Sequence, residues 1–139
     1  MIKISKDNSE QDLQDFAYRW FKLFSENRIN EAILLLDETN SYGTVWTEDT
    51  IKKLIEVDTF GSETRFGREH PEGVTYSNPE TIKKPDYCIA SLIEFTDGRG
   101  YSYEHDFPLN GTWSDLTAHF EFKKIDDHFA VILNDLHVM

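Results

Sequence analysis

Two ionisable residues near the end of the chain have the residue types and the spacing of an acid–base pair. Asp135 and His137 lie two positions apart in the segment 129–139, whose apolar residues predict a strand. Residues at i and i+2 share a strand face, so we expect both side chains to continue the apolar row of residues 129–133 toward the core. A carboxylate that orients one imidazole tautomer can support general acid–base catalysis. The pair is the candidate catalytic site; the alternative is a structural pair that bonds to backbone or solvent.

A second candidate group consists of aromatic and imidazole side chains that combine an apolar ring with a polar atom. Strands predicted to be neighbours carry most of them, and the first predicted helix carries the last. Such side chains suit a pocket for a small flat ligand or a protein hot spot. The alternative is a sheet face packed under the first helix. The group contains Tyr87, Tyr101, Tyr103, His105, Trp113 and Trp20.

Other chemistry has weaker support. The five histidines fall on different predicted elements without metal-ligand spacing, so we expect neither a metal site nor a cofactor. Cys88 is the single cysteine, lies in an apolar run, and is expected to be a buried structural thiol. Arg65, Arg68 and His70 gather in the segment 58–85, where they could clamp an anionic ligand or neutralise neighbouring acids.

The charge balance excludes several classes of partner. The chain has 139 residues and a net charge of −12, from 26 acidic and 14 basic side chains. Residues 86–139 hold ten of the acids against three bases. Such a surface repels nucleic acid and anionic lipid, and it favours a partner with a basic face. One cysteine, no long apolar run and no secretory signal indicate a cytoplasmic protein.

The hydrophobic periodicity predicts helices first and strands afterwards. A helix is expected from Ser9 to Phe24, a second at about 31–36 with Asn30 as its N-cap, and a third after Thr47. The segment 58–85 is expected to be a long surface loop. Strands follow at 87–96, 101–107, 113–122 and 129–133, separated by the turn signals Asp97-Gly98, Asn110-Gly111 and Asp126-Asp127. This order predicts a single α+β domain, 1–139, with three helices packed on a curved antiparallel sheet of about four to five strands.

The order of elements resembles the NTF2-like, cystatin-like cone fold. Two short motifs, Trp113-Ser-Asp-Leu-Thr117 and Asn134-Asp-Leu-His-Val-Met139, resemble a family of small bacterial domains of unknown function that end in an Asp-Leu-His-Val-aliphatic tail. The resemblance implies a bacterial origin and a pocket between the first helix and the sheet. It identifies no catalytic residue.

These observations favour a binding domain without chemistry of its own. The expected partner is a protein with a basic face, recognised through an acidic and aromatic surface, as immunity proteins recognise basic toxins. The alternative is a small-ligand binder or enzyme that uses a pocket under the first helix. A homodimer is a further possibility, because NTF2-like sheets often pair.

Overall fold

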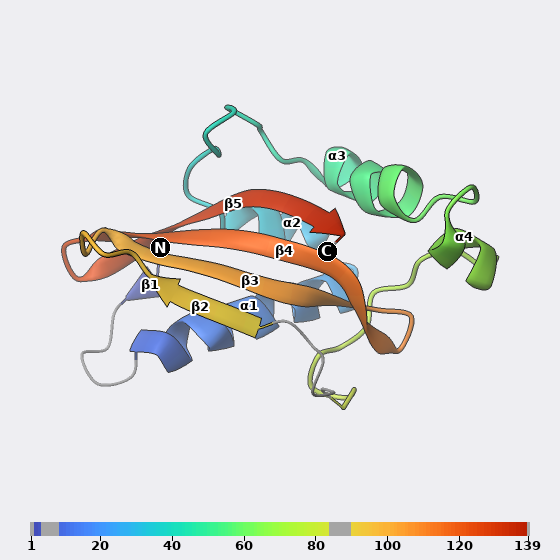
Figure 1. Ribbon diagram of the computed structural model, residues 1–139, viewed down its shortest axis with the longest axis horizontal. Helices are drawn as coiled ribbons and strands as arrows, with labels where there is room; N and C mark the ends of the chain where they lie inside the picture. Colours follow the sequence, from blue (N-terminus) through green and yellow to red (C-terminus); the bar gives the residue numbers. More distant parts are fainter. Residues whose placement is uncertain (1, 4–8, 84–89, 139) are drawn as a thin grey trace.

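Five antiparallel strands form one sheet in the order β1-β5-β4-β3-β2, and the helices precede most of it in the chain (Figure 1). The computed structural model describes residues 2–3, 9–83 and 90–138. The strands are β1 (Ile2–Lys3), β2 (Ala90–Glu94), β3 (Gly100–Leu109), β4 (Thr112–Ile125) and β5 (His128–Val138). The helices are α1 (Ser9–Ser25), α2 (Ile29–Leu34), α3 (Glu48–Lys53), its π-helical continuation η1 (Leu54–Thr59), and α4 (Arg65–Glu69). The predicted α+β class is confirmed.

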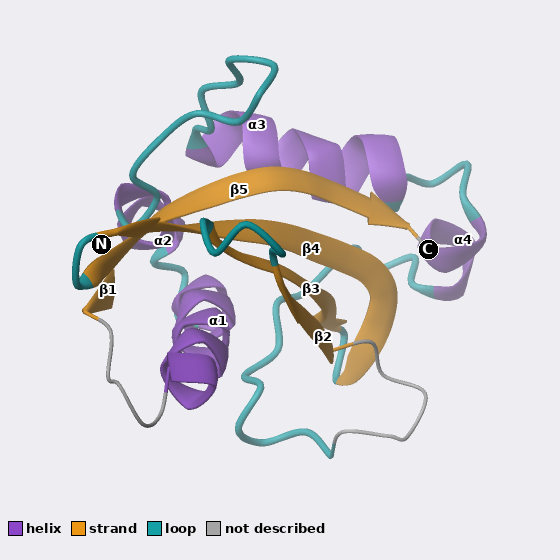
Figure 2. Cartoon of the chain, turned by 60° about the vertical axis from the view of Figure 1, so that its left-hand side comes forward, coloured by secondary structure: helices purple, strands orange, loops and turns teal. Residues whose placement is uncertain are grey.

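The first helix forms where the apolar spacing predicts it and packs against one face of the sheet (Figure 2). Leu13, Ala17 and Trp20 lie on its buried stripe and are fully excluded from solvent. Trp20 Nε1 donates a hydrogen bond of 3.0 Å to the carbonyl of Ala32, which ties α1 to α2. We call the sheet face that α1 covers the inner face.

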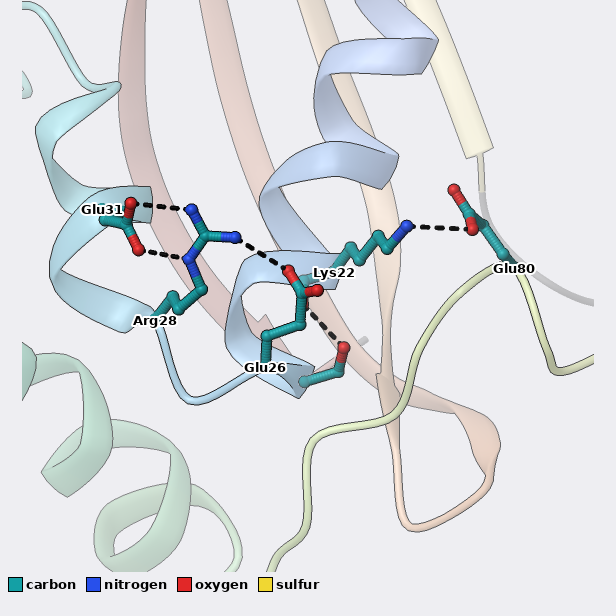
Figure 3. A network of polar contacts seen from close by, with 6 residues as sticks. Lys22, Glu26, Arg28, Glu31 and Glu80 are labelled. Atoms are coloured by element: carbon teal, nitrogen blue, oxygen red, sulfur yellow. Dashed lines mark hydrogen bonds and ion pairs between the residues drawn. The ribbon is translucent and has the colours of Figure 1, made fainter.

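Exposed ion pairs surround the turn between α1 and α2 (Figure 3). Arg28 binds both carboxylate oxygens of Glu31 and lies 3.4 Å from Glu26, while Lys22 reaches Glu80 at 3.2 Å. The hydrogen bonds from Arg28 lower the pKa of Glu31. Because these groups are exposed, the pairs contribute little to the free energy of unfolding.

Two helix predictions need correction, and one is confirmed. The second helix begins at Ile29 after an N-cap at Arg28, which makes no side-chain capping bond, so Asn30 lies inside the helix. The segment 58–85 contains the short helix α4, which the sequence pattern did not predict. The third helix begins after Thr47 as expected. The Thr50 backbone N–H donates to the Thr47 hydroxyl, and the Thr47 backbone N–H donates to the Thr50 hydroxyl, which forms a capping box.

The predicted alternation of β4 is confirmed. Leu116, Ala118, Phe120 and Phe122 are fully buried on the inner face, beneath α1. The strand is joined to β3 at Asn110 and Gly111, whose positive φ angles of 51° and 81° suit a tight hairpin turn. The predicted strand 87–96 is described from Ala90 onward; Tyr87 and Cys88 lie outside the described residues.

A β-bulge changes the predicted faces of β5. Phe120 pairs with Leu133, but His119 pairs with Asp135, so Asn134 is an extra residue without a partner on β4. The inner row therefore continues through Leu136, which is 3% exposed. The expectation that Asp135 and His137 continue the apolar row was wrong, because the bulge turns both toward the outer face.

The segment between α2 and α3 covers the remaining edge of β5. The backbone N–H of Asp37 donates to Val131 O, and the Asp37 carboxylate accepts from Val131 N, both at 2.8 Å. Further along, Trp46 Nε1 donates to Leu133 O and Asn40 Nδ2 donates to Asn134 O. Side chains thus satisfy backbone groups that an open sheet edge would expose.

Candidate binding site

A pocket of about 450 Å³ lies where β4 begins and β5 ends. One wall comes from residues between Thr59 and His70, that is, from the end of η1 and from α4. The opposite wall comes from residues 112–115 of β4 and from Val138 of β5. Figure 2 shows α4 close to the end of β5.

Two glycines allow the η1–α4 wall to fold tightly. A Cβ atom on Gly67 would lie 2.0 Å from the carbonyl oxygen of Gly61, and one on Gly61 would lie 2.3 Å from that of Val57. Thr64 is the N-cap of α4: its hydroxyl accepts from Gly67 N and donates to Gly61 O at 2.7 Å. Only glycine fits at these two positions, and the close backbone contacts that it allows bring Phe60 and Phe66 into contact.

Aromatic rings line both walls of the pocket. The Phe66 ring lies 4.1 Å from Phe60 and 4.4 Å from His70, measured between ring centroids, so the three form a column. Trp113 belongs to the opposite wall, and its other neighbours include His105 at 5.1 Å. The pocket consequently offers aromatic surface from two directions.

The charged groups of the lining differ in how far they are already paired. Arg65 Nε lies 3.1 Å from Glu69 Oε1, and His70 Nδ1 lies 3.1 Å from Glu72 Oε1. Hydrogen bonds from its own backbone and from His70 lower the pKa of Glu72. Asp115 is exposed, and its carboxylate makes no hydrogen bond or ion pair with any residue that the structure describes.

The predicted aromatic group lies mostly in the core. Trp20, Tyr103, His105 and Trp113 are at most 3% exposed and pack in ring contacts with each other or with neighbouring core rings, while Tyr101 is half-buried. Ring contacts join Tyr103, His105 and Trp113 of the group, which lie in the core beneath α1 and not on an exposed surface. Trp113 also lines the pocket, and the other four do not.

The predicted catalytic pair is close in space on the outer face. His137 Nδ1 lies 3.1 Å from Asp135 Oδ2, although the two groups are not aligned as a hydrogen bond. The Asp135 side chain is 56% exposed, and its Oδ1 accepts from the backbone N–H of Leu136. Neither residue lines the pocket. The arrangement matches a polar pair on a sheet surface more closely than an enclosed acid–base site.

Arg65, Arg68 and His70, the predicted anion clamp, bind acids or carbonyls nearby. Arg68 Nη1 donates to the carbonyl of Glu63 at 3.1 Å, and Arg65 and His70 are paired as described above. This favours the neutralising role over an anion clamp.

The sequence did not predict Phe60, Phe66 and Asp115 as pocket residues. The glycine-rich segment that contains Phe60 and Phe66 has no periodicity that would place it beside Asp115.

The outer face of the sheet is the second surface with a distinct composition. In Figure 1 the strands lie in front of α1 and α2, and none of the labelled helices lies before them. Cross-strand pairs align Glu104 with His119 and His119 with Asp135; a neighbouring row aligns Ser102 with Glu121. The buried residues Asp106 and Thr117 share a hydrogen bond of 3.1 Å, next to His137.

No protein-family model, curated protein or solved structure matches this chain. Among the described residues, no helix is long and apolar enough to cross a bilayer. In the same part of the chain, no three His, Cys, Asp or Glu side chains are grouped so as to hold a metal ion.

Proposed function

We propose that the chain is a non-catalytic binding domain that recognises a protein partner with a basic face. The observation that supports this most directly is the outer face of the sheet, where Glu104, Glu121 and Asp135 lie on adjacent strands against Lys123. Ile93, which is 61% exposed, is on the same face and adds apolar contact area. Acidic groups around a partly apolar surface attract and orient a cationic partner.

The charge of this face distinguishes a basic partner from a second copy of the chain. Two copies that paired through their outer faces would bring Glu104, Glu121 and Asp135 of both molecules together, and like charges in an interface are costly. A net charge of −12 adds repulsion at longer range. A homodimer through this face is therefore an outcome that would contradict the proposal.

The wider proposal is an NTF2-like domain of bacterial origin that acts in the cytoplasm. The order of helices and strands and the tail Asp135-Leu-His-Val-Met139 support it. Immunity proteins that neutralise basic toxins are one class that fits the charge. The small-ligand alternative is supported by a different observation, the pocket at the end of the sheet.

The decisive experiment compares two variants with the same change in charge. The sheet variant carries Glu104→Gln, Glu121→Gln and Asp135→Asn. The immobilised wild type and the sheet variant are exposed to an extract of the native cell. We expect the wild type to retain basic proteins that elute as salt is raised, and the sheet variant to lose them.

The matched control neutralises three exposed acids on helices: Glu10→Gln, Asp15→Asn and Asp49→Asn. It should retain the same basic proteins as the wild type. If both variants retained equally few basic proteins, net charge alone would explain the binding, and this would contradict a site on the sheet. Retention by both, or capture of proteins without a basic surface, would overturn the proposal as well.

A further inference from the structure

The pocket at the end of the sheet combines aromatic walls with a carboxylate that has no partner among the described residues. From this combination we infer that the pocket binds a small organic cation, an alkylammonium or a guanidinium group with an apolar stem. The inference does not depend on the proposed function, because the residues involved differ from those of the outer face.

The volume of the pocket sets the size of the ligand. About 450 Å³ lies within the range of small-molecule sites and is far too small for a folded partner. The lining mixes aromatic rings with hydroxyl groups, and two hydroxyls are already used. Thr64 Oγ1 bonds within the turn to α4, and Ser114 Oγ donates to Phe107 O and accepts from Leu116 N. Because both hydroxyls already bond within the protein, other groups of the lining must select the ligand.

The balance of charge in the lining favours a cation. One positive side chain, Arg65, stands against two negative ones, Glu69 and Asp115, and Arg65 is paired with Glu69. His70 faces Glu72, so any positive charge on the imidazole is neutralised within the same segment. Asp115 is left as the carboxylate that a cationic ligand can approach without breaking an ion pair to a described residue.

The aromatic rings favour an organic cation over a metal ion. The column of Phe60, Phe66 and His70 lines the pocket from the end of η1 and from α4, and Trp113 lines it from β4. Indole and phenyl faces attract ammonium and guanidinium groups and also cover an apolar stem. A metal ion would need three or four oxygen, nitrogen or sulfur ligands, and the described residues offer no such group.

The test is a titration of the whole chain with probes of equal length and different charge. The probes are n-butylammonium, n-butylguanidinium, butan-1-ol and butyrate, followed by the NMR signal of the Trp113 indole N–H, assigned with Trp113→Phe. We expect saturable shifts with the two cations and none with butyrate. Butyrate that binds as well as n-butylammonium, or cations that cause no saturable shift, would overturn the inference.

Asp115→Asn is the variant that isolates the carboxylate. We expect it to weaken cation binding by about tenfold, as the loss of one charge-assisted contact implies. Asp126→Asn is the matched control: it makes the same charge change in the exposed turn after β4, at the other end of that strand, and its affinity should equal that of the wild type. Equal weakening in both variants would contradict a site at Asp115. The probe series on the wild type remains decisive if Asp115→Asn misfolds.

One further probe in the same titration distinguishes a lysine side chain of a partner protein from a free amine. A capped Gly-Lys-Gly peptide presents the butylammonium group as a protein would. Binding tighter than that of n-butylammonium assigns the pocket to a lysine side chain of a partner protein, and weaker binding assigns it to a free amine. A peptide and an amine that both fail to bind would overturn the inference.

Discussion

At the scale of single residues, Trp20 and Trp113 are two buried indoles that differ in whether the ring N–H makes a hydrogen bond to a described residue. Trp20 Nε1 donates to Ala32 O at 3.0 Å, whereas Trp113 Nε1 is buried without a hydrogen-bond partner among the described residues. Both rings are at most 3% exposed. A buried N–H without a partner has lost its hydrogen bonds to water and gained no compensating bond.

This difference predicts the outcome of replacing each indole by phenylalanine. Both changes remove a similar volume, but Trp20→Phe also leaves the Ala32 carbonyl unpaired. We expect Trp20→Phe to lower the free energy of unfolding by about 1–3 kcal/mol more than Trp113→Phe does. Urea denaturation of the two variants measures the difference directly. A larger loss in Trp113→Phe would show that its N–H is bonded in solution.

Tyr76 predicts a specific response to alkaline pH. Its hydroxyl is buried without a hydrogen bond to any described residue. Burial raises the pKa of Tyr76, and the negative charges of Glu56 and Glu48 raise it further. The unfolded tyrosine loses its proton from about pH 10, while the folded one retains it. The native state should therefore lose stability as the pH rises above about 10.

Tyr76→Phe removes this source of alkaline instability. We expect the variant to be as stable as the wild type at neutral pH, because no bond to a described residue is lost, and to lose less stability at high pH. Tyr42→Phe is the matched control, since the Tyr42 side chain is 89% exposed. Denaturation curves between neutral pH and about pH 11 test the difference. Identical slopes in the wild type and Tyr76→Phe would contradict the prediction.

At the scale of elements, Asn40 connects the segment between α2 and α3 to the bulge of β5. Its Oδ1 accepts from Tyr42 N and Thr44 N at 3.0 and 2.9 Å, and its Nδ2 donates to Asn134 O. The residue is 8% exposed. Since the amide uses both its donor and its acceptor, a side chain with acceptors alone cannot replace it.

Asn40→Asp tests this connection with an almost unchanged shape. The carboxylate still accepts from both backbone N–H groups but meets the Asn134 carbonyl without a donor. We expect the free energy of unfolding to fall by about 1–3 kcal/mol at neutral pH. Asn78→Asp is the control, because Asn78 Oδ1 accepts from Glu80 N while its amide nitrogen donates to no described residue. Equal effects of the two changes would contradict a role for the Asn40 donor.

The sequence predicted those elements whose local signals agree with the tertiary structure. The stripe of α1, the alternation of β4 and the Asn110-Gly111 turn each combine periodicity with turn chemistry. The faces of Asp135 and His137 were wrong because a bulge has no signal in an apolar run. The pocket was missed because it joins α4 to the far end of β4, and its glycine contacts depend on the tertiary fold.

At the scale of the whole molecule, the charge of −12 predicts the response of stability to salt. Ion pairs such as Arg65–Glu69 and Lys22–Glu80 are exposed and contribute little, whereas repulsion among the excess acids acts on the entire folded chain. Salt screens the attraction within the ion pairs as well as the repulsion among the acids. Because the repulsion is the stronger of the two, screening should stabilise the folded chain.

We expect the melting temperature to rise by several degrees when sodium chloride is raised from low to moderate concentration. Screening shortens the Debye length from about 30 Å at 0.01 M to about 8 Å at 0.15 M, which is less than the width of the sheet and removes most of the repulsion. Thermal unfolding followed by circular dichroism at both concentrations measures the change. The helix variant Glu10→Gln, Asp15→Asn, Asp49→Asn has three fewer negative charges and should show a smaller rise with salt. A melting temperature that falls with salt would mean that the exposed ion pairs outweigh the repulsion.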